Sequence, residues 1–201
     1  MQENGLDTKA RIFNASLRLF ATDGVENATT RGIANAAGIK SASIYNHYKS
    51  KDEILLDCYK YLVDYNANRR LTKDQYLPIL QNGAKEDIIH IPNYDILDGK
   101  SEKIIYAIMV TVARIHTDAR ARDIYHAYKN DTLAYLREFF ETGIAIGRFA
   151  PFDFHPVSLI YLSTKLYVGH SVSADAQNNE SLIENHVKML RLLADFIPFR
   201  Y

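Results

Sequence analysis

The chain has 201 residues, 47% of them hydrophobic and 24% charged, and its 24 lysines and arginines balance its 24 aspartates and glutamates. This composition is typical of an ordered globular protein with room for one sizeable core, or for a small domain joined to a larger one. The single cysteine, Cys58, excludes an internal disulfide and a multi-cysteine zinc site. The sequence has no run of about 18 apolar residues and starts with a polar segment, so we expect no membrane span, no signal peptide and a cytoplasmic location.

The first predicted helix begins at Thr8. Its apolar residues recur at helical spacing on one face, namely Ile12, Ala15, Leu19 and Phe20. Asp7 stands where an N-cap residue is expected. The pair Asp23-Gly24 predicts the end of the helix, because glycine adopts the left-handed conformation at little cost.

Two shorter helices are predicted next. Thr29 is the expected cap of the second helix, whose residues Ile33, Ala34 and Ala37 are spaced to pack on the first. Gly38 should end it, and a third helix is expected from Ser41 to His47, with Ile44 and Tyr48 pointing inward. A helix, a glycine turn and a second helix are the components of a helix-turn-helix.

A long helix follows this motif. In Ser50-Lys51-Asp52-Glu53 a hydroxyl at the N-cap and a carboxylate three residues later form the pattern of a capping box. The apolar stripe then continues to about Asn68. Between residues 69 and 100 the period fails, and we expect one short helix near 74–81 followed by a loop from 82 to 100.

The remaining segments are again helical. Apolar periodicity predicts helices from residue 101, over 118–128, over 131–146, over 156–169 and over 181–196. No segment alternates as a strand would, and no repeat occurs. The predicted fold is all-α, with an N-terminal three-helix DNA-binding domain (residues 1–50) joined by the long helix to a C-terminal helical domain (residues 51–201).

The charge of the helix-turn-helix segment differs from that of the whole chain. Residues 29–51 contain four basic side chains and no acidic one; they are Arg31, Lys40, Lys49 and Lys51. A small DNA footprint requires local rather than global positive charge. The segment therefore predicts contact with a DNA backbone.

Many spaced positions between residues 8 and 56 carry a family resemblance. They are Ile12, Ala15, Leu19, Phe20, Gly24, Thr29, Ile33, Ala34, Ala37-Gly38-Ile39, Ile44-Tyr45, His47-Tyr48 and Ser50-Lys51. In these positions the chain resembles the tetracycline-repressor (TetR) family. The later stretch GIAIGRFAPFDFHP is similar to the usual lead-in to that family's dimerisation helices. The chain departs from the family pattern at Gly32, where an acidic residue is common, and at Lys40, where a serine often opens the recognition helix.

The resemblance implies roles for ten residues of the DNA-binding segment. The expected backbone contacts are Thr29, Arg31, Tyr45, His47 and Lys51. The expected major-groove residues are Lys40, Ser41, Ala42, Ser43 and Asn46. Lys40 at a helix start opposes the helix dipole by about 0.3 to 1 kcal/mol, a placement that a phosphate or a guanine edge would neutralise. Tyr45 could alternatively be a core residue.

For the C-terminal domain, the resemblance implies a homodimer and a small-molecule effector. Dimerisation is assigned to residues 156–169 and 181–196. The chain has 14 tyrosines and no tryptophan, and an amphipathic ring can line a ligand pocket or belong to the core. The candidate ligand-binding residues are Tyr61, Tyr65, Tyr106, Met109 and Tyr167.

The sequence therefore predicts a ligand-responsive transcriptional repressor that binds a palindromic operator as a homodimer. The histidines show no helical metal-site spacing, so no metal and no cofactor are expected. Paired carboxylates, a nucleophile motif and a phosphate loop are also missing, which argues against an enzyme. A helical protein-interaction module that does not bind DNA sequence-specifically stays open as the alternative.

Overall fold

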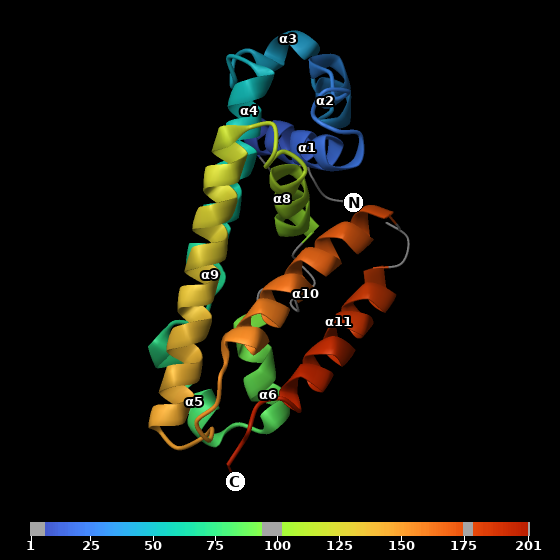
Figure 1. Ribbon diagram of the computed structural model, residues 1–201. Coiled ribbons are helices and arrows are strands. Elements are labelled where there is room, and N and C mark those ends of the chain that lie inside the picture. The colour runs from blue at the N-terminus through green and yellow to red at the C-terminus, as the bar shows by residue number, and fades with distance from the viewer. Residues whose placement is uncertain (1–6, 94–101, 175–178, 201) are drawn as a thin grey trace. The chain divides into compact units, whose positions relative to one another are not determined.

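The computed structural model describes residues 7–93, 102–174 and 179–200, and within them the fold is helical (Figure 1). The helices, in chain order, are α1 (Thr8–Thr22), α2 (Thr30–Ala36), α3 (Ser41–Ile44), α4 (Lys51–Arg69), α5 (Lys73–Asn82), α6 (Lys85–His90), the 3-10 helix η1 (Ile91–Asn93), α8 (Glu102–Val112), α9 (Ala119–Ala145), α10 (His155–Ala174) and α11 (Asn179–Ala194). The β-type pairing within these ranges is one isolated bridge between Phe149 and Phe199. The predicted all-α fold is confirmed.

The chain packs into two compact units. The first unit consists of residues 1–65 and 102–125, and the second of residues 66–101 and 126–201. The segments 51–65 and 102–125 thus pack with the predicted DNA-binding helices. The functional boundary predicted between residues 50 and 51 stays a prediction.

Helix α1 is the centre of the first unit, because it packs against both α2 and α8 (Figure 1). Ile12, Ala15 and Phe20 are buried as predicted. Leu19, however, is only half-buried, whereas Leu17 is fully buried. A helix covered on two sides buries a wider stripe than one amphipathic face, which explains why the single-face pattern missed Leu17.

The predicted helix boundaries hold at several caps. Asp7 occupies the N-cap of α1, although its side chain makes no capping hydrogen bond. Gly24 follows α1 with a φ of 86°, in the left-handed region. The Ser50 hydroxyl accepts a hydrogen bond from the Glu53 amide at 3.2 Å, whereas the Glu53 carboxylate accepts from the Lys49 amide at 2.6 Å, one residue before the partner that a capping box requires.

Part of the loop expected over residues 82–100 is helical. Helix α6 begins after Ala84, whose amide donates to the Asp87 carboxylate at 3.2 Å. Ile88 and Ile89 bury its apolar side in the second unit. Six residues are too few for a detectable apolar period, and alanine is a poor N-cap. Packing against the core of the second unit therefore determines that this segment is helical. The rest of the predicted loop, residues 94–100, lies outside the described residues.

The two helices expected over 118–128 and 131–146 are one continuous helix, α9. The break predicted between these two helices, at residues 129–130, was wrong. Here the Thr132 hydroxyl donates to the Tyr128 carbonyl at 2.8 Å, and the Arg70 guanidinium donates to the Asp131 carboxylate at 2.8 Å. These contacts stabilise the helix against the weak helical preference of Asn and Asp.

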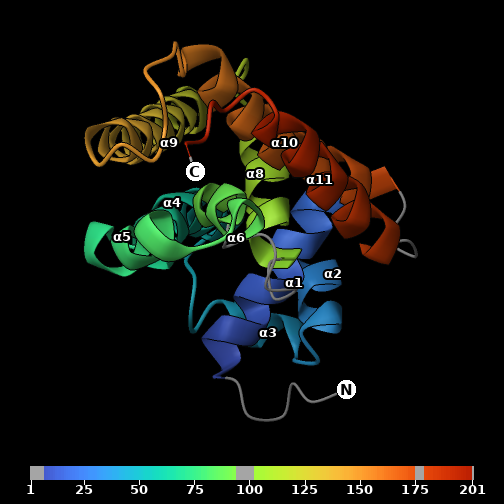
Figure 2. The same cartoon turned by 90° about the horizontal axis from the view of Figure 1, so that it is seen from below.

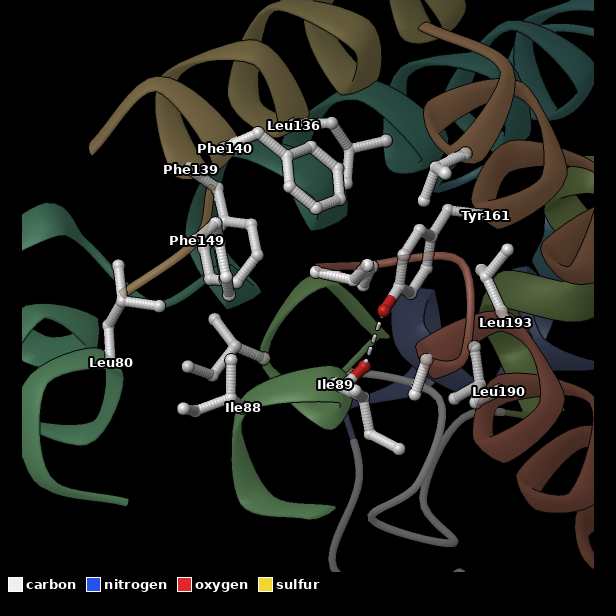
Figure 3. Packing of buried hydrophobic residues seen from close by; sticks show 14 of the residues in the cluster. Leu80, Ile88, Ile89, Leu136, Phe139, Phe140, Phe149, Tyr161, Leu190 and Leu193 are labelled. Carbon is white, nitrogen blue, oxygen red and sulfur yellow. Dashed lines mark hydrogen bonds between the residues drawn. The ribbon is translucent and has the colours of Figure 1, made fainter. Parts of the chain in front are cut away.

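The core of the second unit is built around aromatic rings (Figure 3). Phe140 packs against both Phe139 and Phe149, with ring centroids 5.2 and 6.0 Å apart. Tyr161 is 1% exposed, and its hydroxyl donates to the Ile89 carbonyl at 3.0 Å, which satisfies the buried polar group. Helices α10 and α11 lie side by side at this core (Figure 2).

Gly143 in α9 tests how tightly this core is packed. An alanine Cβ there would lie 2.2 Å from Cε2 of Phe149. A helical Gly→Ala change ordinarily stabilises a protein, but we expect Gly143→Ala to lower the free energy of unfolding by about 1 to 3 kcal/mol through overpacking. Urea denaturation measures this change. An increase in stability would contradict the packing described.

Candidate nucleic-acid interface

The start of α2 is fixed by a side-chain cap. Thr29 has an extended backbone, and its hydroxyl accepts a hydrogen bond from the Gly32 amide at 3.0 Å. This confirms Thr29 as the predicted cap. With glycine at position 32, the reciprocal half of a capping box is missing. Thr29 and Arg31 are both exposed at this helix start.

The turn between α2 and α3 depends on Gly38, which has a φ of 65°. The amide of Ile39 donates to the Ala34 carbonyl at 3.0 Å and the amide of Gly38 to the Asn35 carbonyl at 3.1 Å, which is a Schellman motif. The Arg11 guanidinium of α1 donates to the carbonyls of Ala37 and Gly38. Arg11 thereby holds the turn in place, a role that the sequence pattern did not suggest because the contact spans 26 residues.

The recognition segment is anchored by two buried side chains and exposes the residues between and before them. Ile44 and Tyr48 are 1% and 2% exposed, as predicted. Helix α3 is shorter than expected, and turns continue from Tyr45 to His47. The predicted base-contacting residues are exposed except for the half-buried Ser43; the exposed ones are Lys40, Ser41, Ala42 and Asn46.

Tyr45 is a large side chain on the surface, with 59% of it exposed. The alternative that Tyr45 is a core residue is therefore wrong. Its neighbour His47 is half-buried. Among the described residues, the exposed cations Arg31, Lys40 and Lys49 form no ion pair. The surface of α2 and α3 thus keeps the uncompensated positive charge that the sequence predicts.

Lys51 has a position that the sequence did not reveal. Its ammonium donates to the carbonyls of Val25 at 2.7 Å and Ala28 at 3.0 Å, in the loop between α1 and α2. The Glu26 carbonyl is a more distant acceptor at 3.4 Å. An ammonium has three donors and no acceptor, so these carbonyls use its hydrogen-bonding capacity. Lys51 joins the start of α4 to the segment that leads into α2, and its contact with phosphate stays a prediction.

Two of the candidate ligand-binding residues of the first unit, Tyr61 and Tyr106, line different hollows. The Tyr61 ring packs 5.4 Å from Phe13 and 5.8 Å from Tyr65, beside a groove of about 460 Å³. Tyr106 borders another hollow, of about 210 Å³, together with Arg18. Met109 is half-buried, and the side chain of Tyr167 lies outside those described. The ligand-binding roles of these residues stay predictions.

The described residues offer little for other chemistries. They contain no group of three or more His, Cys, Asp or Glu side chains that could hold a metal ion. No helix in the described ranges is both long and apolar enough to span a membrane. Cys58 is buried, and burial raises the pKa of its thiol well above the ordinary value. A thiol protected in this way is unreactive.

Comparison with known proteins identifies the helix-turn-helix. Residues 12–58 match the family model described as bacterial regulatory proteins, tetR family. Over 63 residues the chain is 36% identical to the HTH-type transcriptional regulator YerO of Bacillus subtilis, a match that covers 31% of this chain and 22% of YerO. Over 106 residues it is 28% identical to the regulator TtgR of Pseudomonas putida, covering 51% of this chain and 50% of TtgR. The chain thus spans half or less of the length of these relatives.

Solved structures share the fold over nearly the whole chain. A transcriptional regulator from Saccharomonospora viridis in complex with choline superposes with a TM-score of 0.71 at 18% identity, covering 96% of this chain and 98% of that one. A tetR-family regulatory protein from Rhodococcus RHA1 superposes with a TM-score of 0.62, also at 18% identity, covering 98% and 100%. The fold and the helix-turn-helix define a two-part helical regulator. The helix-turn-helix of residues 12–58 is thus that of the tetR family of bacterial regulatory proteins, and the whole chain has the fold of a solved regulator of that family.

The contact of Lys51 with the α1–α2 loop can be tested by stability. Lys51→Met leaves the Val25 and Ala28 carbonyls without their charged donor, and we expect the free energy of unfolding to fall by about 1 to 3 kcal/mol. Lys40→Met, at an exposed cation with no ion pair, should change it by less than about 0.5 kcal/mol. Guanidinium denaturation of both variants makes the comparison. Equal stabilities would mean that the carbonyl contacts contribute nothing.

Proposed function

We propose that the protein is a ligand-responsive transcriptional repressor that binds a palindromic DNA operator as a homodimer. The observation that carries the proposal is the surface of α2 and α3, where polar and basic side chains are exposed above two buried anchors. A short helix that exposes its first residues is how a helix-turn-helix presents side chains to base edges in the major groove. The match of residues 12–58 to the tetR family model supports the same function.

The proposed division of contacts is the one that the family resemblance implies. Thr29, Arg31, Tyr45 and His47 bind the phosphate backbone, and Lys51 adds to this set mainly through the loop that it holds. The residues that contact bases are Lys40, Ser41, Ala42, Ser43 and Asn46. Lys40, at the N-cap of α3, is exposed and forms no ion pair with the described residues, so its ammonium is available for a guanine edge or a phosphate.

A dimer is proposed from exposed apolar side chains on the paired helices α10 and α11. Leu159 and Ile160 near the start of α10 are 42% and 45% exposed, and Leu192 and Phe196 in and just after α11 are 65% and 68% exposed. Because a two-fold axis makes such a face self-complementary, two copies would bury it as a four-helix bundle. A dimer would also place two recognition segments on adjacent major grooves, about 34 Å apart along the DNA.

The effector is proposed to be a small molecule bound between the central helices. Two structural neighbours hold small molecules: the Saccharomonospora viridis regulator binds choline, and FadR from Bacillus subtilis binds stearoyl-CoA. The proposed ligand-contacting residues remain Tyr61, Tyr65, Tyr106, Met109 and Tyr167. Such an effector acts by binding one conformation more tightly than the other, and the shift in population would move the DNA-binding helices off the operator.

Substitutions in the recognition segment test the DNA-binding roles. On an operator selected from random-sequence duplexes, we expect Tyr45→Ala to weaken binding about fivefold for selected and scrambled DNA alike, since a backbone contact carries no sequence information. Lys40→Ala should instead change the preferred base at one position of each half-site, at a cost of about 1 to 3 kcal/mol. Fluorescence anisotropy with both duplexes measures these effects. Unaltered binding by both variants would contradict the assigned roles.

The proposed dimer face can be tested separately. Phe196→Glu places a charge on the exposed apolar face, and we expect it to shift the protein from dimer to monomer at micromolar concentration. Sedimentation velocity measures the mass. The control is Glu141→Gln, at an exposed site of α9, which should leave the dimer intact. Leu71→Glu would not serve as a control, because Leu71 packs on the core. A monomeric wild-type chain would remove the basis for a palindromic operator.

A further inference from the structure

An ion pair joins the turn between α8 and α9 to the loop between α1 and α2 in the same unit. Arg114, in that turn, donates to the carboxylate of Glu26, which lies in the loop between α1 and α2. The Arg114 side chain is 20% exposed and that of Glu26 is 74% exposed, so solvent reaches the pair mainly from the Glu26 side. The hydrogen bond from Arg114 holds the pKa of the Glu26 carboxyl below its usual value.

A second ion pair starts from the first turn of α9. The two terminal nitrogens of the Arg120 guanidinium donate to the two carboxylate oxygens of Asp52, both at 2.8 Å. Arg120 also donates to Asp118 from Nη2 at 2.8 Å and from Nε at 3.0 Å. The Asp118 carboxylate is 9% exposed and accepts a further hydrogen bond from the Tyr59 hydroxyl at 3.3 Å. Bidentate pairing of this kind fixes the orientation of the guanidinium relative to the carboxylate as well as the distance between them.

The two ion pairs use residues that are next in the chain to those of the Lys51 contact. Glu26 is next to Val25, whose carbonyl accepts from Lys51, and Asp52 follows Lys51 in the chain. Arg114 thus holds the loop that leads into α2, and Arg120 holds the first turn of α4. The two arginines are six residues apart, in the turn between α8 and α9 and in the first turn of α9. This segment, the α8–α9 corner, therefore fixes the α1–α2 loop and the start of α4 relative to each other.

We infer that Arg114 and Arg120 are positioning residues for DNA binding, which act by fixing the α1–α2 loop against the start of α4 and make no contact with DNA themselves. The inference rests on the proposed function and adds to it a set of residues outside the helix-turn-helix. The loop held in this way ends at Thr29, the cap of α2, so its position determines where Thr29 and Arg31 meet the phosphate backbone. A displaced corner would lower DNA affinity although every DNA-contacting side chain is still present.

The test compares DNA affinity with its salt dependence. We expect Arg114→Gln and Arg120→Gln each to weaken binding to the selected operator about tenfold, within the range that mutations in coupled networks produce. Because no phosphate contact is lost, the slope of log affinity against log salt between about 50 and 200 mM should stay that of the wild type. Arg31→Gln removes a proposed phosphate contact from each of the two protomers, and should reduce the magnitude of that slope by about 1.8.

Three further variants serve as controls. Arg122→Gln removes an exposed arginine of α9 that forms no ion pair with the described residues, and it should bind as the wild type does. Arg120→Lys keeps the charge but loses the bidentate geometry, and should weaken binding less than Arg120→Gln. In the double variant Arg114→Glu with Glu26→Arg, the reversed ion pair should restore most of the affinity that Arg114→Glu alone loses. Circular dichroism confirms that each variant is folded before its affinity is measured.

The outcomes separate the inference from the function on which it rests. Wild-type affinity in the folded Arg114→Gln and Arg120→Gln variants would overturn the inference alone, and so would a slope reduced as in Arg31→Gln, which would indicate direct contact with DNA. Failure of the reversed pair to recover affinity would also overturn it. A wild-type protein that shows no sequence-selective DNA binding would overturn the proposed function, and the inference with it.

Discussion

The contact between the Lys51 ammonium and the carbonyls of Val25 and Ala28 holds the helix-turn-helix together at its two ends in the chain. It joins the residue that begins α4 to the loop that begins α2, and the recognition segment lies between these two points in the chain. Arg11 supplies a similar contact at the other end of α2, where its guanidinium binds the carbonyls of the glycine turn. Two long cationic side chains thus fix both ends of α2 through backbone oxygens.

The placement of acidic residues explains how a chain with no net charge can present a basic surface. Glu26 and Asp52 stand just outside the acid-free segment of residues 29–51. Both are paired with arginines of the α8–α9 corner, and these pairs hold the pKa values of both carboxyls below the ordinary range. Their charges are compensated within the fold, so they oppose the field of Arg31, Lys40 and Lys49 only weakly.

Local signals in the sequence predicted much of the fold and of the interface. The cap at Thr29, the glycine turn at Gly38 and the inward side chains Ile44 and Tyr48 depend on residues only a few positions apart, and all four are confirmed. What the sequence missed depends on distant contacts. Helix α6 is stabilised by the core that it joins, and the continuity of α9 by Arg70.

The same distinction applies to individual residues of the interface. Lys51 was expected to meet phosphate, because its position matched a family pattern and its charge fitted that role. Its carbonyl acceptors lie 23 to 26 residues away in the chain, beyond the reach of any spacing argument. Arg114 and Arg120 had no sequence signal at all, because an arginine in a helical segment is most often solvated. Only the fold brings them to the DNA-binding helices.

The central claim is that the surface of α2 and α3 binds DNA and distinguishes sequences. It is tested most directly by titrating the wild-type protein with its selected palindrome and with a scrambled duplex over a range of salt concentrations. We predict a dissociation constant at least about 10³-fold lower for the palindrome. Affinity for both duplexes should fall steeply with salt, as counterion release requires. Equal affinity for the two duplexes, or binding that does not respond to salt, would contradict the account.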